Sequence, residues 1–303
     1  MDNYPDYSFR TSNINILLHI PNKKNNYAKL VLDSIVDIIQ TVKNSILLIE
    51  DQWNLTLESE GNQSTFIIHD GYSQTDKDRL QYEIEKACYL SVDSLYQVNQ
   101  KKKKKIRFFA TLFKSHYFTM PIIDDEKVIE ISIPKDIFSK VNYIELKQTI
   151  QQICLRLDVT YACLDINLLC PRSIYLDGFF FFSEMPAELL NCETHIPGIH
   201  WAQFITPNMI KNTGSLPMIY ENAPCHYSEL IYKNTEIKGI WIELSKNYWD
   251  INIDERIKMR TYLSSSLYKL SYEKIKQYKS PYKQAEIDFL PLYSCERESF
   301  QIP

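Results

Sequence analysis

The histidines and cysteines of this chain are candidates for metal chemistry, because zinc prefers these two residue types as ligands. The candidates lie in one stretch of the sequence: Cys192, His195, His200, Cys225 and His226. Their spacing matches no common zinc-binding pattern, and Pro197 and Gly198 separate two of the histidines, so the rings are not fixed on one helix face. We therefore predict no metal site and interpret the stretch as a loop followed by strand residues.

Covalent, phosphate and nuclease chemistry find equally little support. The chain has no G-x-S-x-G nucleophile elbow and neither of the glycine-rich phosphate loops, G-x-x-x-x-G-K-[ST] and G-x-G-x-x-G. Cys225 and His226 are adjacent, whereas a catalytic Cys and His usually meet from distant positions. Glu243 and Lys246 follow an apolar run, as acid and lysine do in metal nucleases, but their spacing points them to opposite faces of a strand. We predict no catalytic residue and no cofactor.

The composition is that of a folded protein, and it indicates binding through side chains rather than through glycine-rich backbone loops. Of 303 residues 45% are hydrophobic and 24% charged, which is ordinary for a globular chain. Only 6 are glycine, so few loops can bring backbone close to a phosphate. The seven cysteines form no repeated framework, and Cys154 and Cys163 lie in apolar runs, as reduced, buried cysteines of cytoplasmic proteins do.

Charge points to a basic protein partner. The net charge is −4, so no global field draws the chain to nucleic acid or to a membrane surface. Between Asp158 and Glu255, 13 Asp and Glu oppose 5 Lys and Arg, a difference of −8. The lysine run 101–105 is predicted to be a solvated loop. Without a secretory leader or an apolar run of about 18 residues, a cytoplasmic protein is expected. A merely solubilising surface remains an alternative for the acidic region.

Aromatic residues lie among these acids. They are Trp201, Tyr220, Tyr227, Tyr232, Trp241, Tyr248 and Trp249. Most should be core residues, and we expect two or three to be exposed anchors of the kind that tight interfaces use, with Tyr248 and Trp249 favoured. The predicted partner-binding residues are Asp124, Asp125, Glu126, Tyr248, Trp249, Asp250, Asp254 and Glu255.

Hydrophobic periodicity predicts an α+β fold, with mixed or antiparallel sheets and helices packed on one face. Strands are predicted at residues 13–20, 53–58, 65–69, 107–119, 127–133, 160–168, 179–182, 198–205, 231–232 and 237–244. Helices are predicted at residues 27–42, 75–95, 143–157, 207–213 and 254–278. No clear linker divides the chain, so we expect a single domain, 1–303, with two closely packed lobes, 1–100 and 106–303, as an alternative.

Several segments resemble a known family. KVIEISIPKDIF (127–138), a helix and then VTYACLDINL (159–168) resemble the middle of the type VI secretion immunity proteins that are like immunity protein 52. HIPGIHWAQFITPNMIKNTG (195–214) resembles that family's Gly–Trp segment with its short helix, and residues 238–270 resemble its closing strand, loop and helix. The loop 245–253 departs from the family by lacking Gly and Pro.

The resemblance implies a single immunity-type domain that binds and neutralises a cognate effector toxin in the cytoplasm, without catalysis. A nuclease, whose surface is basic, is the toxin that it implies, and a basic toxin would suit the local acidity. Occlusion of the active site and capture of an inactive form are both open, as are the identity of the toxin and the oligomeric state. An adaptor protein, or an enzyme with an unrecognised site, remains the alternative.

Overall fold

The chain forms two compact units, an N-terminal unit (Asn13–Ala162) and a C-terminal unit (Cys163–Pro303 together with Met1–Ser12). A computed structural model describes Asp78, Leu80, Glu83 and residues 13–21, 27–45, 49–59, 62–69, 89–99, 102–111, 126–166, 193–248 and 253–267.

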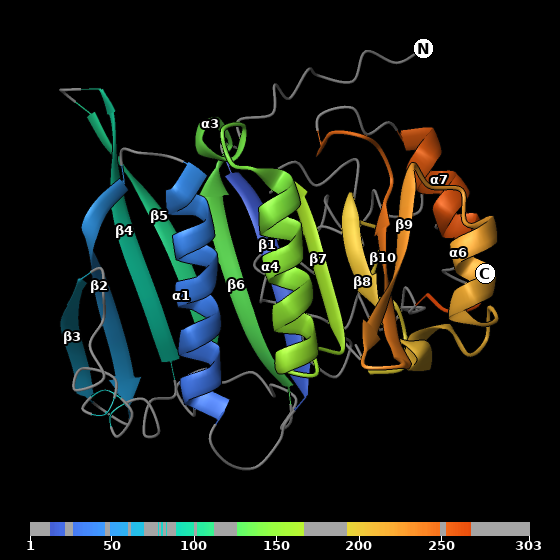
Figure 1. The fold of residues 1–303 in the computed structure, drawn as a ribbon, viewed down its shortest axis with the longest axis horizontal. Helices are drawn as coiled ribbons and strands as arrows, with labels where there is room; N and C mark the ends of the chain where they lie inside the picture. Colours follow the sequence, from blue (N-terminus) through green and yellow to red (C-terminus); the bar gives the residue numbers. More distant parts are fainter. Residues whose placement is uncertain are drawn as a thin grey trace, which may run out of the picture. The chain divides into compact units, whose positions relative to one another are not determined.

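The N-terminal unit is built on an antiparallel sheet whose strands follow the order β3-β2-β4-β5-β6-β1 (Figure 1). Its strands are β1 (Asn13–Pro21), β2 (Ile49–Ser59), β3 (Asn62–His69), β4 (Tyr89–Asn99), β5 (Lys102–Thr111) and β6 (Glu126–Pro134). In the middle of β1, side chains on both faces are buried, including Ile16, Leu17 and Leu18, which is why this strand is an almost continuous apolar run.

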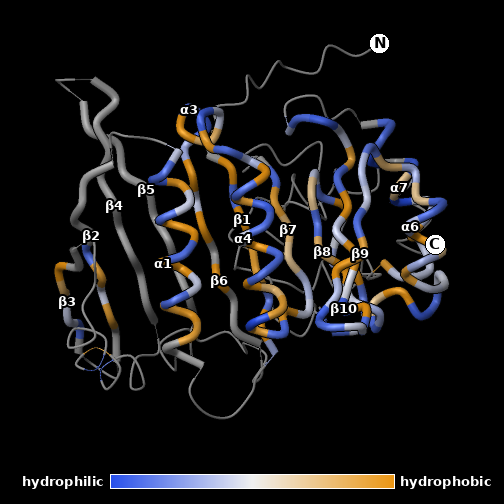
Figure 2. Tube along the Cα trace, viewed as in Figure 1, coloured by the Kyte–Doolittle hydropathy of each residue, from blue (hydrophilic) through white to orange (hydrophobic). Residues whose placement is uncertain are grey.

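Helices α1 (Tyr27–Ser45) and α4 (Tyr143–Arg156) lie side by side on one face of this sheet, and the short α3 (Lys135–Phe138) follows β6 (Figure 1). Apolar residues recur along one side of each helix, as the alternating colours in Figure 2 show, and this stripe is buried. Between the helices, the hydroxyls of Thr41 and Thr149 are 2.9 Å apart, and Arg156 Nη1 lies 2.7 Å from Asp37 Oδ2.

Strand β7 (Tyr161–Ile166) begins in the N-terminal unit and continues into the C-terminal unit. Asp158, with a φ of 48°, makes the left-handed turn between α4 and β7. Beside the start of β7, the Thr160 amide donates to the His19 carbonyl at 2.9 Å.

The C-terminal unit contains the antiparallel strands β8 (Ala202–Ile205), β10 (Glu236–Glu243) and β9 (Tyr227–Lys233), in that order. Asn234, with a φ of 57°, lies in the two-residue turn of the β9–β10 hairpin, as such turns require. The helices are η2 (Pro207–Ile210), α6 (Leu216–Asn222) and α7 (Ile253–Tyr262). The Ser215 side chain caps α6 by accepting from the Met218 amide at 3.4 Å.

The predicted α+β class, with antiparallel pairing, is confirmed. The predicted strands at 13–20, 127–133 and 237–244, the hairpin formed by 53–58 and 65–69, and the helices at 27–42 and 143–157 are all present with small changes of bounds. Residues 179–182 lie outside the described residues. None of the described helices combines the length and apolar character that a bilayer crossing requires.

Two predictions near the middle of the N-terminal unit are wrong. The helix predicted at 75–95 includes Tyr89–Leu95, which belong to β4, because pairing with β2 and β5 overrides local propensity there. The lysine run is not a loop, since Lys102 to Lys105 form the first part of β5. Strands β4 and β5 pair with each other and belong to one unit. The boundary between the alternative lobes 1–100 and 106–303 falls between these two paired strands.

Smaller corrections concern ends of elements and one helix face. The described strand in 198–205 begins only at Ala202, and the 207–213 segment is a 3₁₀ helix followed by a hydrogen-bonded turn rather than an α-helix. Helix α7 begins at Ile253 and ends at Tyr262, with Asp254 in its first turn. Ile144 of α4 is apolar and yet 62% exposed, and helix α6 was not predicted at all.

Candidate partner-binding surface

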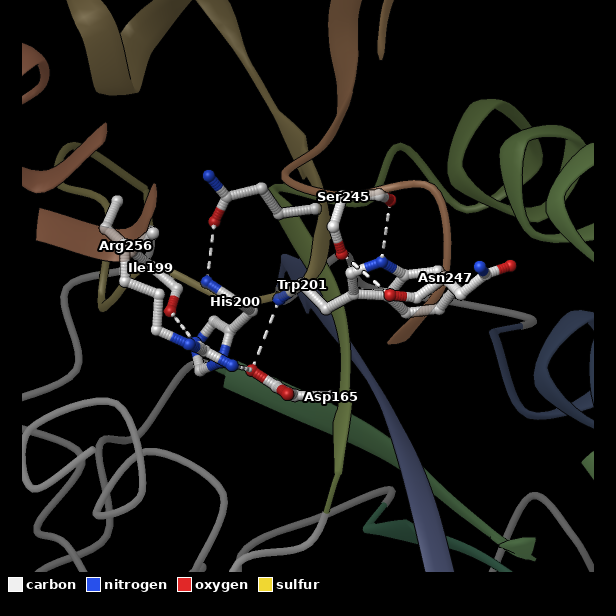
Figure 3. A network of polar contacts seen from close by, with 8 residues as sticks. Asp165, Ile199, His200, Trp201, Ser245, Asn247 and Arg256 are labelled. Atoms are coloured by element: carbon white, nitrogen blue, oxygen red, sulfur yellow. Dashed lines mark hydrogen bonds and ion pairs between the residues drawn. The ribbon is translucent and has the colours of Figure 1, made fainter. Parts of the chain in front are cut away.

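A buried polar network in the C-terminal unit centres on Asp165 of β7 (Figure 3). Arg256 of α7 donates from Nη2 to Asp165 Oδ2 at 2.6 Å, and the Trp201 amide donates to the same oxygen at 3.2 Å. His200 Nδ1 lies 3.5 Å from that oxygen. The side chains of Asp165 and His200 are 2% and 0% exposed, so the network is sealed from solvent.

The Asp165 carboxyl is ionised despite its burial. Desolvation by itself raises its pKa, but the charge of Arg256 and the contact with His200 outweigh it and hold the pKa below the ordinary value. The carboxylate thereby neutralises the guanidinium of Arg256, which would be very costly to bury alone.

Further contacts extend this network to the ends of the neighbouring strands (Figure 3). Arg256 Nη1 donates to the Ile199 carbonyl, and Trp201 Nε1 donates to the Ser245 carbonyl at 3.1 Å. The Ser245 hydroxyl donates to the Asn247 carbonyl at 2.7 Å. The network thus fastens α7 and the loop after β10 to the segment that enters β8.

An Asp–His pair can perform acid–base catalysis when a substrate reaches it, whereas both of these side chains are enclosed. The hydrogen bonds to Asp165 link β7, α7 and the segment that enters β8. No group of three or more His, Cys, Asp or Glu in the described part of the chain could hold a metal ion. Among the histidines and cysteines considered as zinc ligands, His195 contacts the Thr194 hydroxyl at 2.9 Å.

The exposed aromatic residues gather elsewhere, on α6 and β9. Tyr220 of α6 is 48% exposed and Tyr227 of β9 is 37% exposed. The Ser228 hydroxyl donates to the Tyr220 carbonyl at 3.1 Å and holds the end of α6 beside β9. We call the exposed Tyr220 and Tyr227, the half-buried Glu229 and the buried Glu243 together the tyrosine–glutamate surface.

Strand register places aromatic and acidic residues alternately on one face of the β9–β10 hairpin. Tyr227 pairs with Glu243, and Glu229 pairs with Trp241. Along each strand the aromatic donates to the glutamate two residues on: Tyr227 Oη to Glu229 Oε2 at 3.0 Å, and Trp241 Nε1 to Glu243 Oε1 at 3.0 Å. Trp241 and Glu243 are buried, so Tyr227 forms the exposed edge of the array.

This surface carries a negative potential. The pKa of Tyr227 is raised to about 12, first by partial burial and then by its hydrogen bond to Glu229 and the charges of Glu229 and Glu243. The phenol therefore stays protonated at neutral pH and continues to donate to Glu229.

The predicted partner-binding residues have varied positions. Tyr248 was expected to be exposed, which is wrong: it is 3% exposed, because its ring packs edge-on against Trp201 with centroids 5.8 Å apart. Glu126 is the first residue of β6 in the N-terminal unit. Asp254 is exposed and Glu255 half-buried, both in the first turn of α7. Asp124, Asp125, Trp249 and Asp250 lie outside the described residues.

Sequence reasoning missed both polar arrangements. Asp165 is the one acid in the apolar run Tyr161–Ile166, and an acid in a buried strand signals a buried cation, although not which one. Three of the seven aromatics, Tyr220, Tyr227 and Tyr232, prove to be exposed, while Trp201 and Trp241 are core residues.

Comparison with known proteins finds a similar fold but no similar sequence. No protein-family model matches the sequence, and no curated protein matches it. The structure is similar to that of the Pseudomonas aeruginosa T6SS protein PA0821, with a TM-score of 0.54 and 13% identity, over 85% of this chain and 77% of that one. At this identity the similarity concerns the fold.

Proposed function

We propose that this protein is an immunity protein, which binds a type VI secretion effector and neutralises it by direct contact. The protein acts as a binding partner and performs no catalysis. Its target is a basic toxin that acts in the cytoplasm, a nuclease being the kind implied by the sequence resemblance. The fold shared with a T6SS protein is consistent with this role.

The observation that carries the proposal is the tyrosine–glutamate surface. An exposed tyrosine that is hydrogen-bonded to an adjacent carboxylate, as Tyr227 is to Glu229, combines a large contact area with a small loss of side-chain freedom on binding. Negative potential around them accelerates encounter with a basic partner. The buried network around Asp165 supports this role by fastening the ends of the strands in the same unit.

Two further features agree with a cytoplasmic binding protein. Cys154 and Cys163 are buried free thiols, which suits a reducing compartment. Among the described residues of the C-terminal unit, the Asp165–His200–Arg256 cluster is enclosed, whereas a catalytic site would present convergent polar groups to a substrate.

The test uses the product of the neighbouring gene as the candidate toxin. That product is expressed in a sensitive cell with and without this protein, and the two proteins are then purified together. Rescue of growth with a stable stoichiometric complex is the expected result. Toxicity that persists in the presence of this protein, with no complex, would contradict immunity against that toxin.

Association kinetics add a second readout once the pair is in hand. Because carboxylates surround the tyrosines, the association rate should fall as salt rises. An association rate that does not change with salt would remove the acidic surface from the capture step.

A further inference from the structure

We infer that the tyrosine–glutamate surface accepts an arginine side chain of the partner, with the guanidinium against the ring of Tyr227 and paired with the carboxylate of Glu229. The inference extends the proposed function and rests on it in one respect only, namely that the arginine belongs to a toxin.

Geometry provides a platform of the required composition. Tyr227 and Glu229 share a strand face and are joined through their side chains at 3.0 Å, which fixes the carboxylate beside the ring. Tyr220 comes from α6, and its phenol is the last of the groups that raise the pKa of Tyr227. The Ser228 hydroxyl, which contacts the Tyr220 carbonyl at 3.1 Å, lies on the other face of β9. One exposed ring and one adjacent carboxylate thus share a face of β9.

A second carboxylate lies across the hairpin from Tyr227. Glu243 is directly opposite Tyr227 across the hairpin and is 6% exposed, with its position fixed by Trp241 Nε1 at 3.0 Å. A carboxylate buried this deeply is weakly screened by solvent, so its field at Tyr227 is stronger than that of a surface acid. The raised pKa of Tyr227 has the same origin in part.

The chemistry favours arginine over lysine. A guanidinium is flat and weakly hydrated, so it can stack on an aromatic ring while it donates sideways to a carboxylate. An ammonium group is compact and strongly hydrated, and gains less from the same platform. A neutral group of the same shape has neither the cation's attraction to the ring quadrupole nor the charge-assisted hydrogen bond to the carboxylate.

The probe is the capped peptide acetyl-Gly-Arg-Gly-amide, titrated into the full-length protein and followed by NMR. The matched peptides carry lysine, or citrulline, which has nearly the shape of arginine without its charge. We expect saturable shifts for Tyr227 and Glu229 with the arginine peptide, weaker binding of the lysine peptide and none of the citrulline peptide. Equal binding of arginine and citrulline, or no saturable shift with arginine, would overturn the inference.

Variants locate the site. Glu229→Gln should weaken arginine binding by about tenfold or more, the size expected for a charge-assisted hydrogen bond, and Tyr227→Ala should weaken it by a few-fold. The matched controls are Tyr232→Ala, which removes a tyrosine 49% exposed on the opposite face of β9, and Glu236→Gln, which removes a carboxylate already paired with Lys238 at 2.6 Å. Both controls should bind arginine normally, and an equal loss in them would assign the effect to another part of the surface.

The two proposals can fail separately. If the toxin forms a tight complex but Tyr227→Ala and Glu229→Gln leave its affinity unchanged, the arginine site is wrong and immunity stands. If the arginine peptide binds at these residues and the protein protects against no toxin, the site stands and the immunity function is wrong.

Discussion

Removing the charge of Asp165 should destabilise the C-terminal unit severely. In Asp165→Asn the guanidinium of Arg256, whose side chain is 10% exposed, loses the anion 2.6 Å away and remains buried. Breaking one partner of a buried ion pair costs about 3–5 kcal/mol. Whole domains are stable by about 5–15 kcal/mol, so this single substitution would remove a large share of the stability.

Urea denaturation followed by tryptophan fluorescence measures this loss, since Trp201 and Trp241 lie in the same unit. The matched control is Asp37→Asn, which breaks a pair with Arg156 at side chains 42% and 34% exposed and should cost about 0–1 kcal/mol. A loss below about 1 kcal/mol in Asp165→Asn would refute the reasoning, because an unpaired buried charge should destabilise the fold by more than this.

A double variant keeps the test decisive even if Asp165→Asn does not fold. Asp165→Leu combined with Arg256→Met replaces both charges by apolar groups and should be considerably more stable than either single variant. A double variant as unstable as the sum of the two singles would show that the pair has no energetic coupling.

Further predictions concern pH and packing. The pKa of Asp165 is lowered in the folded state, so the ionised carboxylate stabilises the fold fully above the unfolded pKa of about 3.9. This stabilisation is lost as the pH falls through the folded pKa. Between about pH 7 and pH 3 the melting temperature should therefore fall less steeply in Asp165→Asn than in the wild type. Gly239→Ala should cost about 1–3 kcal/mol in the same urea assay, because a Cβ there would lie 2.3 Å from the Phe204 ring. Glu229→Gln should lower the pKa of Tyr227 from about 12 in an ultraviolet titration of the phenol, and an unchanged pKa would contradict the hydrogen bond between them.

The sequence predicted best where one periodicity was strong. The apolar stripe of α1 and the alternation of β6 each match one kind of element, and both are confirmed. The prediction failed where pairing partners decided the structure, as in β4, whose first residues continue a helical pattern but pair with β2 and β5. The long lysine run was misleading for the same reason, since strand pairing tolerates lysine when a neighbouring strand supplies the hydrogen bonds.

The polar arrangements were harder to predict than the elements. Asp165 and Arg256 are 91 residues apart, so their pairing depends on a tertiary fold that no local pattern encodes. Tyr248 looked like an exposed anchor because it adjoins polar residues, but its ring fills the space beside Trp201. Tyr227 and Glu229 carry a local signal, because residues two apart in a strand share a face, and the same spacing relates Trp241 to Glu243 on the paired strand.

The affinity of this protein for the neighbouring toxin tests the central claim most directly, measured by calorimetry with the wild type and with a Tyr220→Ala/Tyr227→Ala double variant. Immunity by tight binding through the tyrosine–glutamate surface predicts a Kd of about 1 nM or below for the wild type and a loss of about 2 kcal/mol or more in the variant. A Kd in the micromolar range would indicate an adaptor instead, and a nanomolar Kd unchanged by the double substitution would contradict the assignment of this surface.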